Sequence, residues 1–475
     1  MTKGRTLPAW AWLSHRWHLV ALALLVATAI LLRVGSYGDP RLSIATSDTN
    51  NIIESSHLPL LSWQFLTSNR PATIALLYKI LEPGSGYALV QIGQPAVSDP
   101  TVKACQPGLD RIVVAQMVLA ILAWSALAMV TARHLNNRVL KVVGAALILG
   151  FGFSPALAEW DSVLMSEPVS LSLFALLLAL TLELAVRIAN LRGRPDTGTW
   201  VVVGIWLVVL VLWVFARDSN AYMLPVTIVM ILLVLSPRSL RRRLPSAYLL
   251  GMAVLMAGLF VFHNATLRAS DRWINPFLNN LIYEILPDEN RLAFFSDLGM
   301  PATEEVLAFR TSRGNESGFL ALPDFMAWVR TRGYSSYARF LLAHPRWAVN
   351  FLMRNLGFLF SENFQPYYRE QPGNYPVWFK PIGEMLHPTS SAPVLMDVLA
   401  ILGLLVLARR LGGRALAIGW FFLWLLLCEF LMLFVAFYGD SLGVIRHALV
   451  AIVPLRLSIW VLPLFGMDFA LGKEP

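Results

Sequence analysis

The sequence is short of charge and of cysteine, and both shortages narrow the class of protein. Only 14% of the residues are charged, whereas 57% are hydrophobic, a balance that soluble globular domains do not have. The two cysteines, Cys105 and Cys428, fall in an expected external loop and an expected membrane span, so we expect no disulfide between them. Cys, His and acidic residues show no metal-ligand spacing. We therefore predict no cofactor and no metal ligands, and leave metal dependence open.

Motifs of the common nucleotide-binding and hydrolase folds are missing as well. The chain has no Walker loop, no GxGxxG sequence after a strand and no GxSxG elbow, and each of these would have marked a known kind of site. We also find no convincing internal repeat, low-complexity tract or soluble catalytic domain. Any chemistry must therefore come from residues that are scattered along the chain.

Long apolar stretches fill much of the sequence instead. Runs of roughly 17–25 apolar residues fit the hydrocarbon core of a bilayer, which is about 30 Å thick. The predicted fold class is an all-α polytopic membrane protein with about ten transmembrane helices and amphipathic juxtamembrane helices in its first outer loop. The predicted spans cover residues 17–34, 112–132, 140–157, 169–186, 200–215, 222–235, 247–261, 394–408, 415–437 and 448–471.

Basic residues mark every second loop, which predicts that both termini are cytoplasmic. The formal net charge of +9 then reflects topology, and we expect no nucleic-acid partner. No A-x-A-like cleavage site follows the first span, so we interpret it as a retained anchor. The basic clusters are Lys3, Arg5 and Arg16; Arg133, Arg138 and Lys141; Arg187, Arg192 and Arg194; Arg238, Arg241, Arg242 and Arg243; and Arg409, Arg410 and Arg414.

Two long regions between the spans are expected on the outer face. The first, residues 35–110, belongs to an N-terminal transmembrane module that covers residues 1–261. The second is an outer segment at residues 262–393, and C-terminal transmembrane helices cover residues 394–475. Helical periodicity within these regions predicts short amphipathic helices, which in the first region should lie along the membrane surface. The predicted helices cover residues 52–66, 74–81, 325–342 and 347–360.

Acidic residues just beyond the first span are candidates for a catalytic base. Asp48 opens an apparent helix at residues 49–56, and local sequence alone favours an N-cap role, because Asp accepts from free backbone N–H groups there. An acid at that position can serve both as cap and as catalyst. Asp39 follows the first span more closely, and it is either a turn residue or the second candidate for the base.

Further charged residues lie at the outer ends of expected spans. Glu167, between Ser166 and Pro168, suits the first turn of the fourth span, but this does not explain why Asp161 and Glu159 share its short loop. Arg217 ends the fifth span, where it could offset the helix dipole, extend to the interface or pair with Asp218.

The start of the last span is less easily explained by helix chemistry. Arg446 and His447 stand where the helix dipole would prefer acids, and an anion bound at that helix N-terminus would account for them. Glu429, inside the ninth span, is nearly the only charge within a span, and it is either a functional acid or one half of a local pair. The aromatic loop at residues 367–379 favours an interfacial belt, with sugar stacking as the alternative.

Several short motifs follow one another in a familiar order. Ser47-Asp48-Thr49 and Asn69-Arg70-Pro71 come after the first span, and they are followed by Leu164-Met165-Ser166-Glu167-Pro168 and Ala216-Arg217-Asp218. This order resembles the GT-C class of membrane glycosyltransferases, which includes protein O-mannosyltransferases and the lipid A aminoarabinose transferase. The resemblance covers residues 17–235 and continues weakly beyond. Ile52 and Ala72 stand where the family often has Tyr and Pro, so both Asp48 and Asp39 stay candidates for the base.

The resemblance implies an enzyme of the cell (inner or plasma) membrane with its active site on the extracytoplasmic face. Its donor would be a polyprenyl-phosphate sugar, its acceptor a hydroxyl of a lipid, glycan or protein, and transfer would invert the anomeric carbon. The resemblance also implies roles for individual residues. Asp48 or Asp39 would be the general base, Arg217, Arg446 and His447 would face the phosphate, Asp161 and Glu167 would hold sugar or acceptor hydroxyls, and Arg70 would belong to the substrate-binding set.

Three other functions stay open. A secondary transporter would need paired repeats and broken helices with polar residues near the bilayer midplane. A polysaccharide polymerase or ligase would use outer arginines rather than an acid after the first span. A non-catalytic scaffold with a degenerate GT-C fold would keep the architecture and lose the chemistry.

Overall fold

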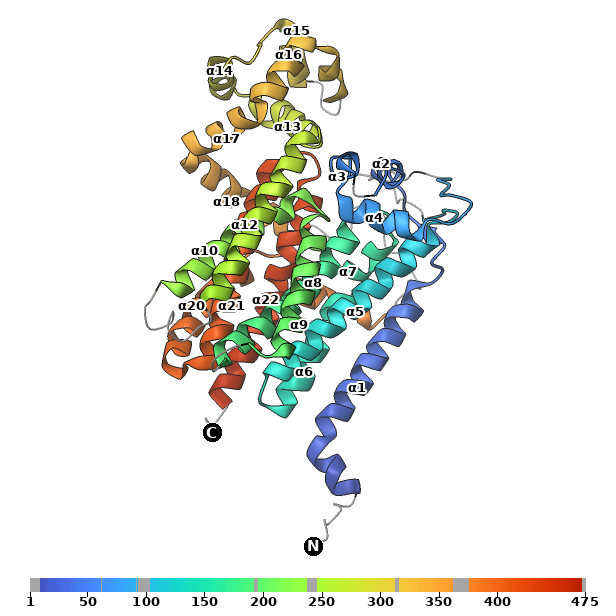
Figure 1. The fold of residues 1–475 in the computed structure, drawn as a ribbon, viewed down its shortest axis with the longest axis vertical. Helices are drawn as coiled ribbons and strands as arrows, with labels where there is room; N and C mark the ends of the chain where they lie inside the picture. Colours follow the sequence, from blue (N-terminus) through green and yellow to red (C-terminus); the bar gives the residue numbers. More distant parts are fainter. Residues whose placement is uncertain are drawn as a thin grey trace.

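Helices packed side by side form a tall bundle, and a smaller helical layer rises above one end of it (Figure 1). The computed structural model describes residues 9–60, 62–90, 92, 103–191, 195–236, 246–311, 316–361 and 376–471. Within these residues, nine helices are long and apolar enough to cross a membrane, or ten if the bent pair at residues 138–153 and 155–162 is one span. The predicted all-α polytopic membrane fold is thereby confirmed. The long helices are α1 (Ala9–Tyr37), α5 (Asp110–His134), α6 (Arg138–Phe153), α8 (Glu167–Asn190), α9 (Thr197–Val214), α10 (Met223–Leu235), α12 (Ser246–Ala269), α20 (Ala392–Leu411), α21 (Gly413–Gly439) and α22 (Val444–Leu471).

Helix α6 ends earlier than its predicted span, which continues through residue 157. It ends at Phe153, and the chain turns by 48° into α7 (Pro155–Ala158) and the 3₁₀ turn η1 (Glu159–Ser162). Pro155 disfavours helical geometry at the residue before it, and Ser154 is accordingly extended, with φ −62° and ψ 154°. The bend carries the chain over the top of the bundle toward the start of α8.

The first outer loop is tied to this same turn. It contains α2 (Ser47–Ser56), α3 (Trp63–Leu66) and α4 (Ala72–Leu81), with a two-stranded pairing of β1 (Leu42–Ser43) and β2 (Ala104–Cys105). Ile44 N donates to Ser162 O at 2.8 Å and Leu164 N donates to Ile44 O at 3.0 Å. The start of α2 is therefore held beside the start of α8.

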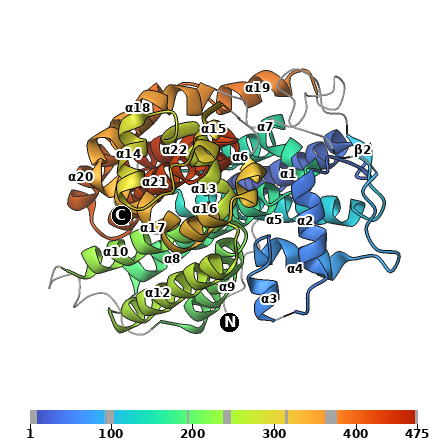
Figure 2. The same ribbon diagram turned by 90° about the horizontal axis from the view of Figure 1, so that it is seen from above.

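The outer segment forms its own apolar cluster above the bundle. Phe295, Phe319 and Phe325 are fully buried in it, and viewed from above α13 and α16 lie over the bundle while α2 to α4 lie to one side (Figure 2). The elements of the segment are α13 (Ile274–Asn280), the π turn η3 (Leu281–Ile285), α14 (Glu289–Asp297), α15 (Glu304–Ala308), η4 (Phe309–Thr311), η5 (Glu316–Ala321), α16 (Pro323–Trp328), the π turn η6 (Val329–Gly333), α17 (Tyr334–Ala343), α18 (Pro345–Ser361) and α19 (Phe379–Leu386).

The last two of these helices lie alongside the bundle instead of above it. Arg456 Nη2 donates to Phe360 O at 2.6 Å, and Trp460 Nε1 donates to Leu386 O at 2.8 Å. Trp460 stands 16 residues into α22, about 24 Å along its axis at the usual helical rise. Helices α18 and α19 therefore reach down beside α22.

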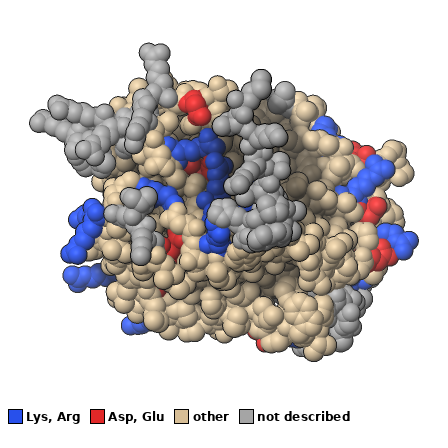
Figure 3. All heavy atoms as spheres, turned by 90° about the horizontal axis from the view of Figure 1, so that it is seen from below, with Lys and Arg blue, Asp and Glu red and all other residues tan. Residues whose placement is uncertain are grey.

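Basic residues gather at the end of the bundle opposite the outer layer, where Lys and Arg side chains are seen from below (Figure 3). The last turns of α5, α8 and α20 carry Arg133, Arg187, Arg409 and Arg410. The predicted basic loop at residues 238–243 lies outside the described residues. The start of α1 and the end of α22 are at this same end (Figure 1), as an even number of spans requires.

Candidate active site

A cavity of about 800 Å³ opens between the bundle and the outer layer. Its walls come from the first outer loop, the turn before α8, the 3₁₀ turn η2 (Asp218–Tyr222), helix α13 and the start of α22. Residues far apart in the sequence thus meet in one place. Six of the residues predicted for the site line it: Asp48, Arg70, Glu167, Arg217, Arg446 and His447.

Asp48 holds two arginines in this cavity. Arg70 Nη2 donates to Asp48 Oδ1 at 2.5 Å, and Arg446 Nη1 donates to Asp48 Oδ2 at 3.2 Å. The interpretation of Asp48 as the N-cap is wrong, because Thr46 occupies the cap position and Asp48 lies in the first turn of α2. Helix α2 therefore presents this carboxylate to the cavity instead of using it to close its own end.

Glu167 is buried, with 1% of its side chain exposed, and it also contacts two arginines. Its Oε1 lies 3.1 Å from Arg217 Nη1 and 3.4 Å from Arg446 Nε. Ser166 stands at the N-cap position of α8 but makes no capping hydrogen bond, and its hydroxyl donates to Glu167 Oε2 at 3.3 Å. Arg446 thus bridges the two acids, with one nitrogen on Asp48 and another on Glu167.

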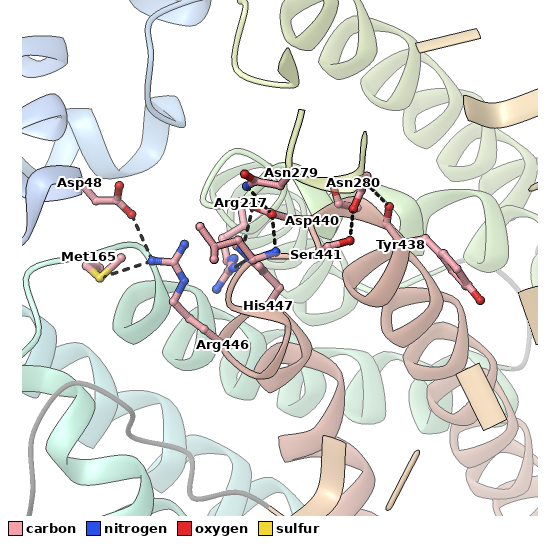
Figure 4. A network of polar contacts seen from close by, with 12 residues as sticks. Asp48, Met165, Arg217, Asn279, Asn280, Tyr438, Asp440, Ser441, Arg446 and His447 are labelled. Carbon is pink, nitrogen blue, oxygen red and sulfur yellow. Dashed lines mark hydrogen bonds and ion pairs between the residues drawn. The ribbon is translucent and has the colours of Figure 1, made fainter. Parts of the chain in front are cut away.

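Arg217 is buried, so the prediction that it extends to the membrane interface is wrong. The predicted pair with its neighbour Asp218 is also wrong, because Arg217 contacts Glu167. Asp218 instead contacts Arg272 at 3.2 Å and His263 at 3.5 Å. Arg217 Nη2 donates to His447 Nδ1 at 3.0 Å. The close view shows Arg217, His447 and Asp440 together, with Arg446 reaching from α22 toward Asp48 (Figure 4).

Asp39 and Asp161 lie elsewhere, and neither is among the described residues that line the cavity. Asp39 is paired with Arg41 at 2.7 Å on the surface, and the hydrogen bonds from Arg41 lower the pKa of its carboxyl. Asp161 is buried against Arg33 of α1, and Arg33 also donates to Ala158 O at 3.0 Å. The expected grouping of Asp161 with Glu167 is therefore wrong, because the turn η1 directs Asp161 toward α1.

Other residues of the site were not predicted. Arg272, just after α12, donates to the carbonyl oxygens of Ser68 and Arg70 at 3.0 and 3.2 Å, and so fixes the loop that carries Arg70. Asn279 and Asn280, at the end of α13, bind the loop before α22. Two adjacent asparagines beside apolar residues are a signal in the sequence that could have indicated them. Five carboxylates, of Asp48, Glu167, Asp218, Asp271 and Asp440, thereby line the cavity together with five guanidinium groups, of Arg70, Arg217, Arg272, Arg330 and Arg446.

Aromatic residues form a further wall of the cavity. Tyr222, Trp273, Tyr334 and Tyr337 line it, and the hydroxyls of Tyr222 and Tyr334 lie 3.2 Å apart. Phenol rings offer an apolar face and a polar tip, which suits both sugar rings and lipid. Most of the aromatic loop predicted at residues 367–379 lies outside the described residues.

The spans contain more ionisable groups than expected from the sequence, in which Glu429 is nearly the only charge predicted within a span. Besides Glu429, which is buried in α21, Asp397 and Arg456 lie within long helices. Asp397 Oδ2 accepts from Ser458 Oγ at 2.5 Å, and Arg456 is held by Phe360 O. Among the described residues no group of three or more His, Cys, Asp and Glu side chains is arranged to hold a metal ion.

Comparisons with known proteins give a likeness only at the level of chain arrangement. No protein-family model and no curated protein matches the sequence. Among solved structures, the archaeal oligosaccharyltransferase AglB from Archaeoglobus fulgidus, in complex with an inhibitory peptide and a dolichol-phosphate, is 15% identical with a TM-score of 0.45, over 98% of this chain and 53% of that one. The apo form of the Archaeoglobus fulgidus oligosaccharyltransferase is 14% identical with a TM-score of 0.43, over 94% and 51%.

This chain therefore spans about half the length of those structures. Both are structures of an oligosaccharyltransferase. Identities of this size leave the function to be argued from the site itself.

Proposed function

We propose that this protein is an integral membrane glycosyltransferase that moves a sugar from a polyprenyl-phosphate donor to an acceptor hydroxyl at the outer face of the cell membrane. The observation that carries the proposal is the convergence of Asp48 with Arg217 and Arg446 in one cavity at the end of the bundle. A carboxylate that accepts a proton and cations that stabilise a leaving phosphate are the two requirements of this transfer.

The phosphate would bind Arg446 and Arg217. Both are preplaced by Glu167, which is buried beneath them, so little reorganisation is needed when charge develops on the leaving group. A phosphate oxygen on Arg446 would compete with Asp48 for that guanidinium. Donor binding would then weaken one of the two contacts that occupy the Asp48 carboxylate.

Asp48 would be the general base. Each carboxylate oxygen has two lone-pair sites, so Oδ1 can keep its bond from Arg70 while the carboxylate accepts a bond from the acceptor hydroxyl. The acceptor oxygen then attacks the anomeric carbon and forms the new C–O bond as its proton passes to Asp48. The bond from that carbon to the phosphate oxygen breaks, and its electron pair leaves with the polyprenyl phosphate.

The lipid part of the donor needs an apolar path to the cavity. Leu267 of α12 and Phe434 and Val435 of α21 line the cavity beside Tyr222. These residues belong to long helices with large apolar surfaces. A polyprenyl chain could therefore stay among apolar side chains while its phosphate reaches the arginines.

The test compares two acids of the first outer loop. In Asp48→Asn a proton acceptor is lost with little change in size, and transfer from a panel of radiolabelled polyprenyl-phosphate sugars should fall by about 10²–10⁴. Asp39→Asn is the matched control, because Asp39 is a surface residue paired with Arg41, and it should keep full activity. Near-normal transfer by folded Asp48→Asn protein would reject Asp48 as the base. Loss of transfer in Asp39→Asn alone would move the base to Asp39.

A further inference from the structure

The outer segment is fastened to the loop between α21 and α22 by two adjacent asparagines. Asn279 Nδ2 donates to Asp440 Oδ1 at 2.7 Å. Asn280 Nδ2 donates to Tyr438 O at 2.8 Å, and Ser441 Oγ donates to Asn280 Oδ1 at 2.6 Å. Both asparagines are at least nine-tenths buried. The last turn of α13 thus holds the segment that enters α22.

Only the first of these two fastenings continues toward the arginines. Asp440 Oδ2 lies 3.4 Å from His447 Nε2, and the other ring nitrogen, Nδ1, faces Arg217 Nη2 at 3.0 Å. The line of contacts from Asn279 through Asp440 and His447 to Arg217 is visible in Figure 4. Asn280 contacts the backbone and Ser441, and does not join this line.

The chemistry of the donors assigns the state of the imidazole. A guanidinium donates and cannot accept, so His447 Nδ1 must offer a lone pair to Arg217. The ring proton then sits on Nε2, 3.4 Å from Asp440 Oδ2, and this second partner of the ring fixes the tautomer. If Asp440 could not accept, a proton on Nδ1 would face the Arg217 guanidinium, donor against donor, and Arg217 would be displaced from Glu167.

We propose that Asp440 and Asn279 are positioning residues for Arg217. Asn279 of α13 orients the Asp440 carboxylate, Asp440 fixes the tautomer of His447, and His447 holds the Arg217 guanidinium in place. The consequence for donor binding rests on the proposed function, in which Arg217 binds phosphate. The tautomer itself does not, since it follows from contacts within this chain. The rival account is that both asparagines simply attach the outer segment to the bundle.

The direct test is the tautomer. Solid-state NMR of protein labelled with ¹⁵N-histidine, in lipid bilayers, distinguishes protonated from unprotonated ring nitrogens, and His447→Gln identifies the signals of His447. Wild type should show Nδ1 unprotonated and Nε2 protonated. Asp440→Asn, whose amide can donate to Nε2, should reverse them, and Asn279→Ala should give a mixture. An unchanged tautomer in Asp440→Asn would overturn the proposal.

Binding of a short-chain polyprenyl phosphate, measured by calorimetry, is the second arm. Asn279→Ala and Asp440→Asn should weaken binding roughly tenfold, the order expected when a hydrogen bond to a charged group is lost. Ser441→Ala is the matched control, because it loosens the second fastening from a residue that does not line the cavity, and it should lower thermal stability without weakening binding. Equal weakening by Asn279→Ala and Ser441→Ala would favour simple attachment and overturn the positioning role. A wild type that binds no polyprenyl phosphate would refute the proposed function, while the tautomer result would still decide the positioning.

Discussion

Arg446 is a single residue that joins two acids from separate parts of the chain. Its Nη1 contacts Asp48 and its Nε contacts Glu167. A guanidinium can do this because its nitrogens are fixed in a planar fork, whereas a Lys ammonium is a single point of charge on a flexible stem. The geometry, and not merely the charge, is therefore what position 446 supplies.

Arg446→Lys should weaken binding of a short-chain polyprenyl phosphate by roughly 10–100-fold, because one or more charge-assisted hydrogen bonds are lost while the net charge is kept. Titration calorimetry on the purified protein measures this. Arg41→Lys is the control, because Arg41 forms an exposed pair with Asp39 and such pairs contribute little. Unchanged affinity in Arg446→Lys would show that position 446 needs only a positive charge.

Most of the site residues could be predicted from the sequence, but the direction in which each side chain points could not. Chain order and topology placed Arg217 and Arg446 at the same end of the bundle, which was enough to bring them together. Asp161 was wrongly grouped with them because a short turn can direct a side chain either way, and Arg33, 128 positions earlier in the chain, decides the direction. Asn279 was missed because its role depends on a partner 161 positions away.

At the scale of elements, helix α2 matters because its position determines where Asp48 lies. Thr49 Oγ1 accepts from Thr46 N at 2.8 Å and donates to Leu164 O at 2.9 Å, so one hydroxyl closes the helix start and fastens it to the strand-like segment before α8. The helix predicted from periodicity at residues 52–66 is wrong in its bounds, because α2 ends at Ser56 and α3 begins only at Trp63. The capping residue could not be predicted, because Asp48 matches the cap preference as well as Thr46 does.

Thr49→Val should detach α2 from that segment. Valine keeps the shape of threonine but removes both hydrogen bonds from a fully buried site, which should cost about 1–3 kcal/mol of stability and lower transfer activity through Asp48. Thermal unfolding and the transfer assay measure the two effects. In the control Thr67→Val, the hydroxyl bond to Trp63 O is lost, but Trp63 O still accepts a backbone bond from Thr67 N. Stability and transfer activity should therefore change little. Equal stability of Thr49→Val and wild type would mean that α2 is held by apolar packing alone.

For the whole molecule, the distribution of charge favours the proposed enzyme over a transporter. The ionisable groups inside the spans are mostly held locally, as Asp397 is by Ser458 and Arg456 by Phe360. The larger set of acids and arginines lies around the cavity at one end. A transporter would place its binding groups near the midplane, whereas transfer from a lipid-linked donor needs them where the lipid phosphate lies, at the membrane surface.

The long apolar helices could be predicted because hydrocarbon thickness and apolar run length are directly related. The paths of α18 and α19 beside α22 could not, since their amphipathic patterns fit a membrane surface and a bundle flank equally well. The basic loops indicate which end of the bundle faces outward. This orientation decides on which side of the membrane the cavity opens.

The orientation can be measured with cysteines. Cys105 is exposed and Cys428 is buried, so a membrane-impermeant maleimide should label wild type in right-side-out vesicles, and Cys105→Ser should remove the label. In the Cys105→Ser background, Ser335→Cys, at an exposed position of α17, should restore labelling. Asn190→Cys, at the exposed end of α8, should react only after the vesicles are permeabilised. Labelling of Asn190→Cys in sealed vesicles would reverse the topology and place the cavity, with Asp48 and its arginines, on the cytoplasmic side.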